Sequence, residues 1–347
     1  MNSREALINT FLESTVWKNA GRQALNQDAS FRRYWRLELS GITVMLMDAP
    51  PPEKPVSLFA DIANFLRNKG LHAPAIYDVD ESQGLMLIED FGDDTFTRIL
   101  KSEPLKETAL YDLAIDTLVK LHRINSCSGL SLAAYDSRTM IDEAQLFIEW
   151  FYPVMTGKPA STEQIDSYRS AWQESLTNLT PHAKVLVLRD FHVDNLMKLA
   201  RDGRSPVCGL LDFQDALTGS PAYDLMSLIE DARRDISGEL KDRCLQRYFT
   251  AMAAQKDFPG QKELTPWLNV LAAQRHAKVL GIFVRLYKRD NKANYLEHLP
   301  RVLALYTAAL ERESALKPVL QWMANNLPPE DINLNTLPKP QHAKNHR

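Results

Sequence analysis

The first ninety residues carry apolar side chains at the spacing of strands and of amphipathic helices. Residues 31–39 alternate apolar with other positions, as a half-buried strand does. Residues 42–47 form a more continuous apolar run after the turn signal Ser40-Gly41, and the prolines at 50–52 end that run because proline cannot donate to a ladder. The pattern predicts a small sheet with strands at 31–39, 42–47, 75–79 and 85–88, and helices at 3–20 and 57–69.

Helical periodicity dominates after residue 92, with a strand-like island at 185–188 and 207–211. A β-rich part followed by an α-rich part predicts an α+β fold of two lobes. We therefore expect an N-lobe over residues 1–91, a C-lobe over 92–327 and a flexible polar, Pro-rich tail over 328–347. Helices of the C-lobe are expected at 106–124, 139–152, 162–178, 221–234, 237–254, 263–288 and 297–316.

Composition narrows the class of protein. The 41 basic and 44 acidic residues leave a net charge of -3, so the chain shows no nucleic-acid footprint. Three cysteines lie far apart without a CxxC pair, which argues against a disulfide framework or a zinc site and favours a reducing cytoplasm. The N-terminus lacks the apolar core of a signal peptide, and no apolar run of about 18 residues predicts a membrane span.

The segment from 185 to 225 carries the chemistry. Asp190 and Asn195 follow one strand with four residues between them, and Asp212 ends a later strand. Kinase catalytic loops use this spacing, with the first aspartate accepting the substrate hydroxyl proton and the asparagine and second aspartate binding Mg²⁺. Asp and Asn are also common turn residues, so each alone is consistent with a plain turn. The joint pattern favours Asp190 as the catalytic base and Asn195 and Asp212 as metal ligands.

Residues 188–195 (LRDFHVDN), 212–216 (DFQDA) and 221–225 (PAYDL) resemble the aminoglycoside phosphotransferase and choline kinase superfamily. This resemblance implies a protein-kinase-like bilobal fold that binds ATP and Mg²⁺ between the lobes. The further motifs are similar to the anomeric kinases for N-acetylmuramate and N-acetylglucosamine of cell-wall recycling. They imply a small sugar as substrate and a sugar 1-phosphate as product. These motifs are ASFRRY at 29–34, MDAPP at 47–51 and QRHAKVLGIF at 274–283. The balanced charge and the lack of a long apolar run are the reasons to expect no nucleic-acid or membrane partner.

The sequence departs from the kinase pattern at three places. Leu188 stands where a histidine often precedes Arg-Asp, and Gln214 stands where the metal loop has glycine. The strand at 42–47 has no lysine for the ATP phosphates, and the helix after it has no matching glutamate. Arg32, Arg33 and Arg36 are candidates to supply positive charge near the phosphates, and the sequence does not choose among them.

The resemblance extends to further binding residues. Ser30 and Arg32 belong to an expected phosphate-covering turn, which lacks glycine and is equally consistent with an ordinary turn. Glu89 and Phe91 match the hinge whose backbone binds the adenine edge. Asp215 fits either a role behind the metal loop or contact with a substrate hydroxyl.

Arg275 and Lys278 share one face of the expected helix at 263–288 with Arg285. That face is consistent with a solvated basic surface or with recognition of an anionic substrate group, such as a lactyl carboxylate. Three other polar residues, His122, His192 and Asp224, are interpreted as structural.

Two other functions remain open from the sequence. A kinase for an aminoglycoside, a choline-like amine or another alcohol has the same catalytic set, although a polycationic substrate requires surplus acids that this balanced chain lacks. A catalytically silent kinase-like binding module explains the missing lysine. The complete set of Asp190, Asn195 and Asp212 argues against it.

Overall fold

The computed structural model describes residues 3–25, 32–52, 55–124, 126–201 and 204–338, and of residues 201–204 it describes no side chains. The chain forms two compact units. The first combines residues 1–132 with 188–216, and the second combines 133–187 with 217–347. The expected lobe boundary at residues 91–92 is not tested by this division and stays a prediction.

An antiparallel sheet in the order β1-β2-β3-β5-β4 forms the centre of the first unit. Its register pairs Arg33 with Asp48 and Met45 with Ile88, so alternate residues of each strand face opposite sides. The five strands are β1 (Gly21–Ala24), β2 (Arg33–Leu39), β3 (Ile42–Asp48), β4 (Ile76–Asp80) and β5 (Leu85–Glu89).

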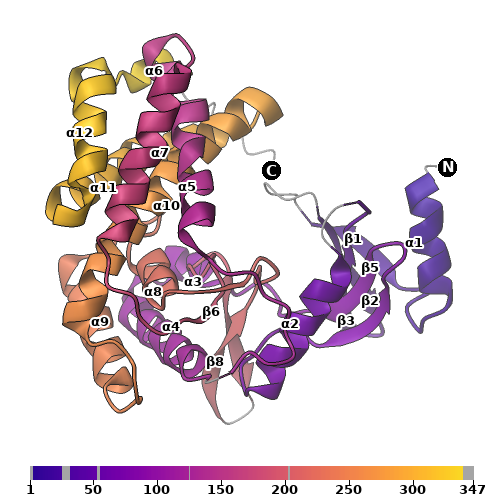
Figure 1. Cartoon of the computed structure of the whole chain (residues 1–347). Coiled ribbons are helices and arrows are strands. Elements are labelled where there is room, and N and C mark those ends of the chain that lie inside the picture. Colours follow the sequence, from indigo (N-terminus) through magenta and orange to yellow (C-terminus); the bar gives the residue numbers. More distant parts are fainter. Residues whose placement is uncertain (1–2, 26–31, 53–54, 125, 202–203, 339–347) are drawn as a thin grey trace. The chain divides into compact units, whose positions relative to one another are not determined.

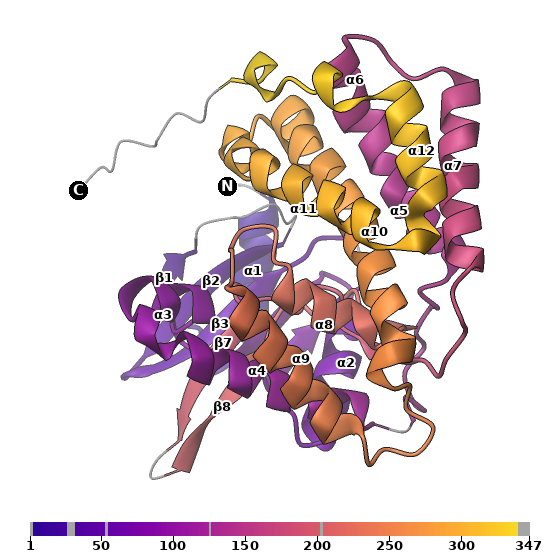
Figure 2. The ribbon, with the colours of Figure 1, turned by 90° about the vertical axis from the view of Figure 1, so that its left-hand side faces the viewer.

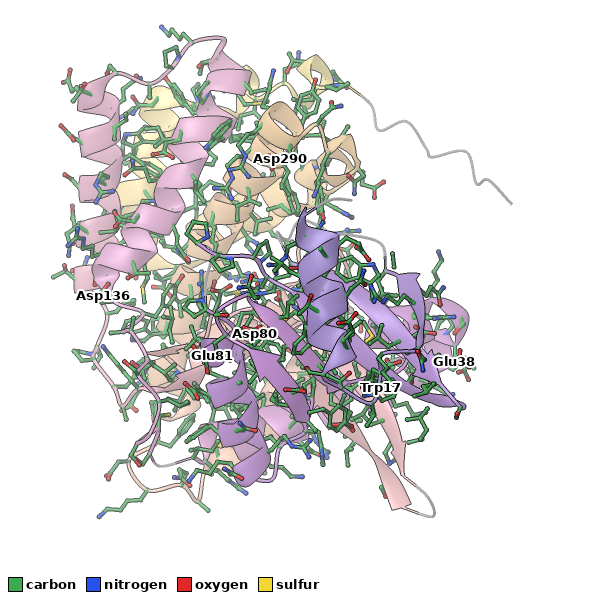
Figure 3. All side chains as sticks on the ribbon, turned by 90° about the vertical axis from the view of Figure 1, so that its right-hand side faces the viewer. Trp17, Glu38, Asp80, Glu81, Asp136 and Asp290 are labelled. Carbon is green, nitrogen blue, oxygen red and sulfur yellow. The ribbon has the colours of Figure 1, made fainter. Side chains whose placement is uncertain are left out.

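The two faces of this sheet carry different side chains. On one face, α1 (Ser3–Glu13) packs against buried leucines of β2, β3 and β5, and Trp17, labelled in Figure 3, closes the same cluster. The alternate positions, Tyr34 and Arg36 with Met45, Met47, Met86 and Ile88, belong to the other face. Figure 1 shows α2 (Val56–Asn68) on that side of the sheet. We call this second side the nucleotide face, for reasons given below.

The remainder of the first unit is helical apart from one hairpin. The hairpin pairs β7 with β8 so that Leu196 lies opposite Leu210. The residues just outside it, Asn195 and Leu211, are therefore held side by side. The elements of this part of the first unit are α3 (Phe96–Ser102), η1 (Pro104–Lys106), α4 (Glu107–His122), β7 (Leu196–Arg201) and β8 (Arg204–Leu210).

The second unit packs helices around the 30-residue helix α10 (Gln261–Asp290). Figure 2 shows α11 beside α10, and α7 beside α12. Gly281 lets α10 approach α5 closely, because a Cβ there would lie 2.2 Å from the carbonyl oxygen of Leu146. A two-stranded ladder of β6 and β9 completes the unit. The other elements are α5 (Ser137–Leu146), η2 (Phe147–Phe151), α6 (Tyr152–Thr156), α7 (Thr162–Thr177), β6 (Val185–Val187), β9 (Leu217–Gly219), α8 (Ala222–Ile229), α9 (Gly238–Met252), η3 (Ala293–His298), α11 (Leu299–Arg312), η4 (Ser314–Leu316), α12 (Lys317–Asn326), η5 (Pro329–Asp331) and η6 (Leu334–Thr336).

The predicted α+β class is confirmed, and the expected strands and helices are present with shifted ends. The helix expected over 221–234 ends at Ile229, and part of the expected tail forms the short turns η5 and η6. Within the described residues, no helix is both long enough and apolar enough to span a membrane.

Candidate active site

The catalytic loop is closed by hydrogen bonds around Asp190. The carbonyl oxygen of Asp190 accepts from the backbone N–H of His192 at 3.1 Å and from Nδ2 of Asn195 at 3.0 Å. The backbone N–H of Asn195 donates to the His192 carbonyl at 2.9 Å. Because the amide nitrogen of Asn195 is engaged inside the loop, its Oδ1 is the atom left to meet a cation. Arg189 has a φ of 74°, the kind of backbone strain that clusters at functional sites.

The metal loop begins where β8 ends. The backbone N–H of Leu211 donates to the Asn195 carbonyl at 3.0 Å, which ties the start of this loop to the catalytic loop. Asp212 is exposed and has a φ of 55°. Phe213 is fully buried, with its ring centroid 4.8 Å from that of Phe59 in α2. The buried Phe213 ring thus anchors the loop at Asp212, whose backbone is strained and whose carboxylate is exposed.

Gln214 has a role that sequence reasoning missed. Its Nε2 donates to Oδ1 of Asp212 at 2.7 Å, and the side chain is only 3% exposed. The glutamine found in place of the usual glycine therefore orients the Asp212 carboxylate and leaves its second oxygen open. Its long polar side chain next to a predicted metal ligand was the available signal.

The donor atoms fit Mg²⁺ bound together with a nucleotide. Asn195 Oδ1 and the Asp212 carboxylate would offer hard oxygen ligands, while the described residues contain no group of three or more His, Cys, Asp or Glu side chains arranged for a metal. Mg²⁺ is typically held by one or two carboxylates, with waters and substrate phosphates completing its shell. A sparse oxygen set is what that mode of binding requires.

The three arginines of the β2 region have separate environments. Arg33 donates to Asp48 at 2.6 and 3.1 Å on the α1 face, where Arg4 binds the same carboxylate. Arg36 binds the acids at 90 and 93 instead. Neither is directed at the metal loop by these contacts.

Arg32 is 7% exposed and precedes Arg33, so strand alternation places it on the nucleotide face beside Tyr34. The pKa of Tyr34 is raised to about 12, mainly by burial, with Arg32 lowering it and Asp212 raising it. Both charges therefore act on the Tyr34 hydroxyl. The structure brings together Arg32, Tyr34 and Asp212, and sequence reasoning had missed Tyr34.

The hinge segment, residues 89–94, connects β5 to α3. The backbone N–H of Glu89 donates to the Ala75 carbonyl at 2.8 Å, and its carboxylate accepts from Ala75 N–H at 3.0 Å and from Arg67 at 3.2 Å. The Phe91 ring packs on Gly209, where a Cβ would lie 2.9 Å from ring atoms. No described residue hydrogen-bonds the Phe91 backbone N–H.

A pocket of about 830 Å³ also opens at the hinge segment. No catalytic-loop or metal-loop residue lines it, nor do the methionines of the nucleotide face. It shares Glu89, Asp90 and Phe91 with the hinge segment. Its lining includes Arg67, His72, Glu89, Asp93, Arg98 and Lys198.

The expected substrate residues on α10 are packed rather than solvated. Arg275 is 8% exposed, donates to the Tyr223 hydroxyl at 3.1 Å and lies 5.6 Å from the centre of that ring. Lys278 forms an ion pair of 3.0 Å with Glu143, whose carboxylate also accepts from the Tyr135 hydroxyl at 2.6 Å. The interpretation as a solvated basic face is therefore wrong for these two residues.

The other expected residues are placed as follows. Ser30 lies outside the described residues. Asp215 is half-buried in the loop that follows Asp212, and its role stays a prediction. His122 ends α4 in the core, where burial lowers its pKa to about 3. Asp224 is fully buried in the first turn of α8, consistent with a structural role.

Comparisons with known proteins identify the family of this chain. Residues 21–258 match the model of the phosphotransferase enzyme family. The chain is 31% identical to the N-acetylmuramate/N-acetylglucosamine kinase of Caulobacter vibrioides, over 95% of this chain and 98% of the relative. It is 35% identical to the protein of the same description from Neisseria meningitidis, over 88% and 90%.

Solved structures agree on the fold. Choline kinase LicA from Streptococcus pneumoniae matches with a TM-score of 0.62 at 14% identity, over 88% of this chain and 100% of that chain. The ADP-bound aminoglycoside phosphotransferase APH(2'')-Ib matches with a TM-score of 0.58 at 14% identity, over 89% and 98%. The chain belongs to the phosphotransferase enzyme family.

Proposed function

We propose that this kinase transfers the γ-phosphate of ATP to the anomeric hydroxyl of N-acetylmuramate, N-acetylglucosamine or both, in the cytoplasm. The observation that carries the proposal is the similarity, along nearly the whole chain, to relatives described as kinases of these two sugars. The closed catalytic loop supports it, because hydrogen bonds join Asn195 to the Asp190 backbone and tie Asn195 to Leu211, next to Asp212, and this is the residue set that phosphoryl transfer uses.

Asp190 acts as the base in this proposal. Its carboxylate accepts the proton of the sugar hydroxyl while the oxygen–phosphorus bond forms and the bond to the ADP leaving group breaks. The anomeric hydroxyl is more acidic than the other sugar hydroxyls, so it suits a carboxylate base. Asn195 and Asp212 would hold Mg²⁺, which neutralises phosphate charge when bound, and Gln214 keeps Asp212 in position.

Arg32 is our candidate for the cation that replaces the missing phosphate-binding lysine. Arg32 and Arg36 both lie on the nucleotide face, but Arg36 is engaged by Asp90 and Asp93, whereas Arg32 shares the surroundings of Tyr34 with Asp212. Its guanidinium can make two parallel hydrogen bonds to phosphate oxygens, which a lysine cannot. Ser30, just outside the described residues, would add a hydroxyl donor.

Arg275 and Lys278 are proposed to recognise the sugar. A buried arginine held by Tyr223 is pre-oriented for a planar carboxylate such as the lactyl group of N-acetylmuramate. Lys278 would have to exchange its ion pair with Glu143 for a substrate contact. Asp215 is proposed to accept a substrate hydroxyl.

The test is phosphorus NMR of the product made from each sugar with ATP and Mg²⁺. An anomeric, acid-labile phosphate is expected. A phosphate on C6, or rapid turnover of an amino alcohol without turnover of either amino sugar, would contradict the proposal and favour a kinase of another alcohol. Absence of Mg²⁺-dependent ATP consumption with every acceptor would favour a silent binding module.

A further inference from the structure

Three charged residues join β2 to the hinge segment: Arg36, Asp90 and Asp93, which we call the hinge clamp. Nε and Nη2 of Arg36 donate to the two oxygens of Asp90 at 2.6 and 3.1 Å, and Nη2 also reaches Asp93 at 3.0 Å. The Asp90 side chain is 4% exposed and that of Arg36 is 19% exposed. This is a bidentate, largely buried ion pair rather than a surface contact.

The hinge clamp lies on the nucleotide face. Arg36 pairs with Met45 of β3, and Met45 pairs with Ile88 of β5, so these side chains share the side opposite α1. Asp90 follows Ile88 by two positions. It stands between Glu89 and Phe91, the two residues whose backbone atoms are expected to bind the adenine edge.

Asp90 also shapes the backbone around it. Its Oδ1 accepts from the backbone N–H of Gly92 at 2.9 Å, and Gly92 has a φ of 77°, a conformation that suits glycine. This bond fixes the turn that follows Phe91. Burial alone would raise the pKa of Asp90, but hydrogen bonds from Arg36 and Gly92 lower it, so the carboxylate stays charged at neutral pH.

We propose that the hinge clamp is a positioning device that holds the Glu89 carbonyl and the Phe91 N–H in the geometry that selects adenine over guanine nucleotides. Adenine offers an amino donor and a ring-nitrogen acceptor, which match a backbone carbonyl and N–H. Guanine offers the reverse pair along the same edge. Selection therefore depends on the exact placement of two backbone groups, and this inference rests on the proposed kinase function.

The experiment compares Arg36→Ala with Arg33→Ala. Both arginines lie on β2 and donate through Nε and Nη2 to a buried aspartate, but Arg33 donates to a single oxygen of Asp48 on the α1 face. The dissociation constants of Mg·ATP and Mg·GTP are measured by calorimetry without sugar, together with the unfolding temperature. Arg36→Lys and Asp90→Asn supply milder changes at the same pair.

Arg36→Ala should weaken ATP binding by about tenfold or more while GTP binding changes little, so the preference for ATP falls. Arg36→Lys should restore part of that preference, because it keeps the charge and loses the fork. Arg33→Ala should lower the unfolding temperature and keep the preference. An equal fall in preference for both alanine variants, or no fall in either, would overturn the proposal.

Measurements of nucleotide binding and of sugar turnover distinguish the hinge clamp proposal from the proposed kinase function. If the wild-type protein prefers ATP but phosphorylates no sugar, the proposed function fails while the altered preference of Arg36→Ala still supports the hinge clamp. If the wild-type protein binds ATP and GTP equally, the hinge clamp proposal is overturned although sugar turnover can persist. If it binds neither nucleotide, both fail.

Discussion

Gln214→Met should raise the Mg²⁺ requirement of this kinase without abolishing its activity. The change keeps most of the side-chain volume in a site that is 3% exposed, and it removes the 2.7 Å hydrogen bond to Asp212. A hydrogen bond to a charged group contributes about 1.5–3 kcal/mol, and loss of a partner behind a metal ligand weakens metal binding by about 10–100-fold. We expect the apparent Mg²⁺ constant to rise within that range.

The assay is the initial rate as a function of free Mg²⁺ at saturating ATP and sugar. The rate should recover toward the wild-type value at high Mg²⁺, because Asp212 itself is still present. Gln164→Met is a matched control, since its Nε2 donates to the Tyr152 hydroxyl at 2.8 Å in the second unit. The control should keep the wild-type Mg²⁺ curve.

A double substitution tests the physical reason. Once Asp212→Ala has removed the carboxylate, Gln214→Met should add little further loss, because the two residues act through one hydrogen bond. Additive losses, or a Mg²⁺ curve for Gln214→Met that superimposes on that of the wild type, would refute the role assigned to Gln214.

Asp190→Asn should lower turnover by about 10²–10⁴-fold and preserve ATP binding, measured by steady-state kinetics and calorimetry; a rate within about tenfold of the wild type would exclude it as the base. Arg32→Met should lower kcat/KM for ATP by about tenfold or more, whereas Arg33→Met should not. Arg275→Ala should reduce kcat/KM for N-acetylmuramate more than for N-acetylglucosamine, and the extra loss should correspond to about 1.5–3 kcal/mol of activation free energy. Equal losses for the two sugars would assign Arg275 to packing on Tyr223. Burial alone would raise the pKa of Glu230, but His276, Lys241 and Arg312 lower it to about 2 from an ordinary 4.5. Ionised Glu230 contributes about 3 kcal/mol to the free energy of unfolding; this contribution is complete above pH 4.5 and is lost as the pH falls toward 2. The unfolding temperature of Glu230→Gln should therefore fall less steeply over that pH window than that of the wild type. An unchanged slope would contradict this role of Glu230.

Much of the fold follows from local periodicity, and the errors have local causes. β2 and β3 were predictable because burial on one or both faces imposes a pattern on the sequence. β1 was missed because all four of its residues are exposed. β9 has three residues and pairs with β6, some thirty positions earlier, so neither its length nor its partner has a local signal. α12 was missed although Val319, Trp322 and Met323 are buried at helical spacing.

The candidate site likewise has some features that local sequence patterns predict and others that they do not. Asp190, Asn195 and Asp212 can be proposed from the sequence because each belongs to a short contiguous motif. The roles of Arg33 and Arg36 could not be predicted from the sequence. These roles depend on strand register and on the partners Asp48 and Asp90, which lie 15 and 54 positions away. The burial of Arg275 is not predictable from the sequence, because a helical face of basic residues gives no indication of what covers it.

The arginines in and directly before β2 account for the missing lysine on β3 if the proposed roles hold. In β2 a shift of one residue moves a side chain to the other face, so Arg32 and Arg33 cannot share a function although they are adjacent. Arg33 neutralises the buried Asp48 and stabilises the packing of α1, while Arg36 reaches the hinge and Arg32 shares the surroundings of Tyr34 with Asp212. If Arg32 binds the phosphates and Arg36 positions the hinge, one strand governs both ends of the nucleotide. A lysine on β3 is then unnecessary, and so is its glutamate partner in α2, which explains why the two are missing together.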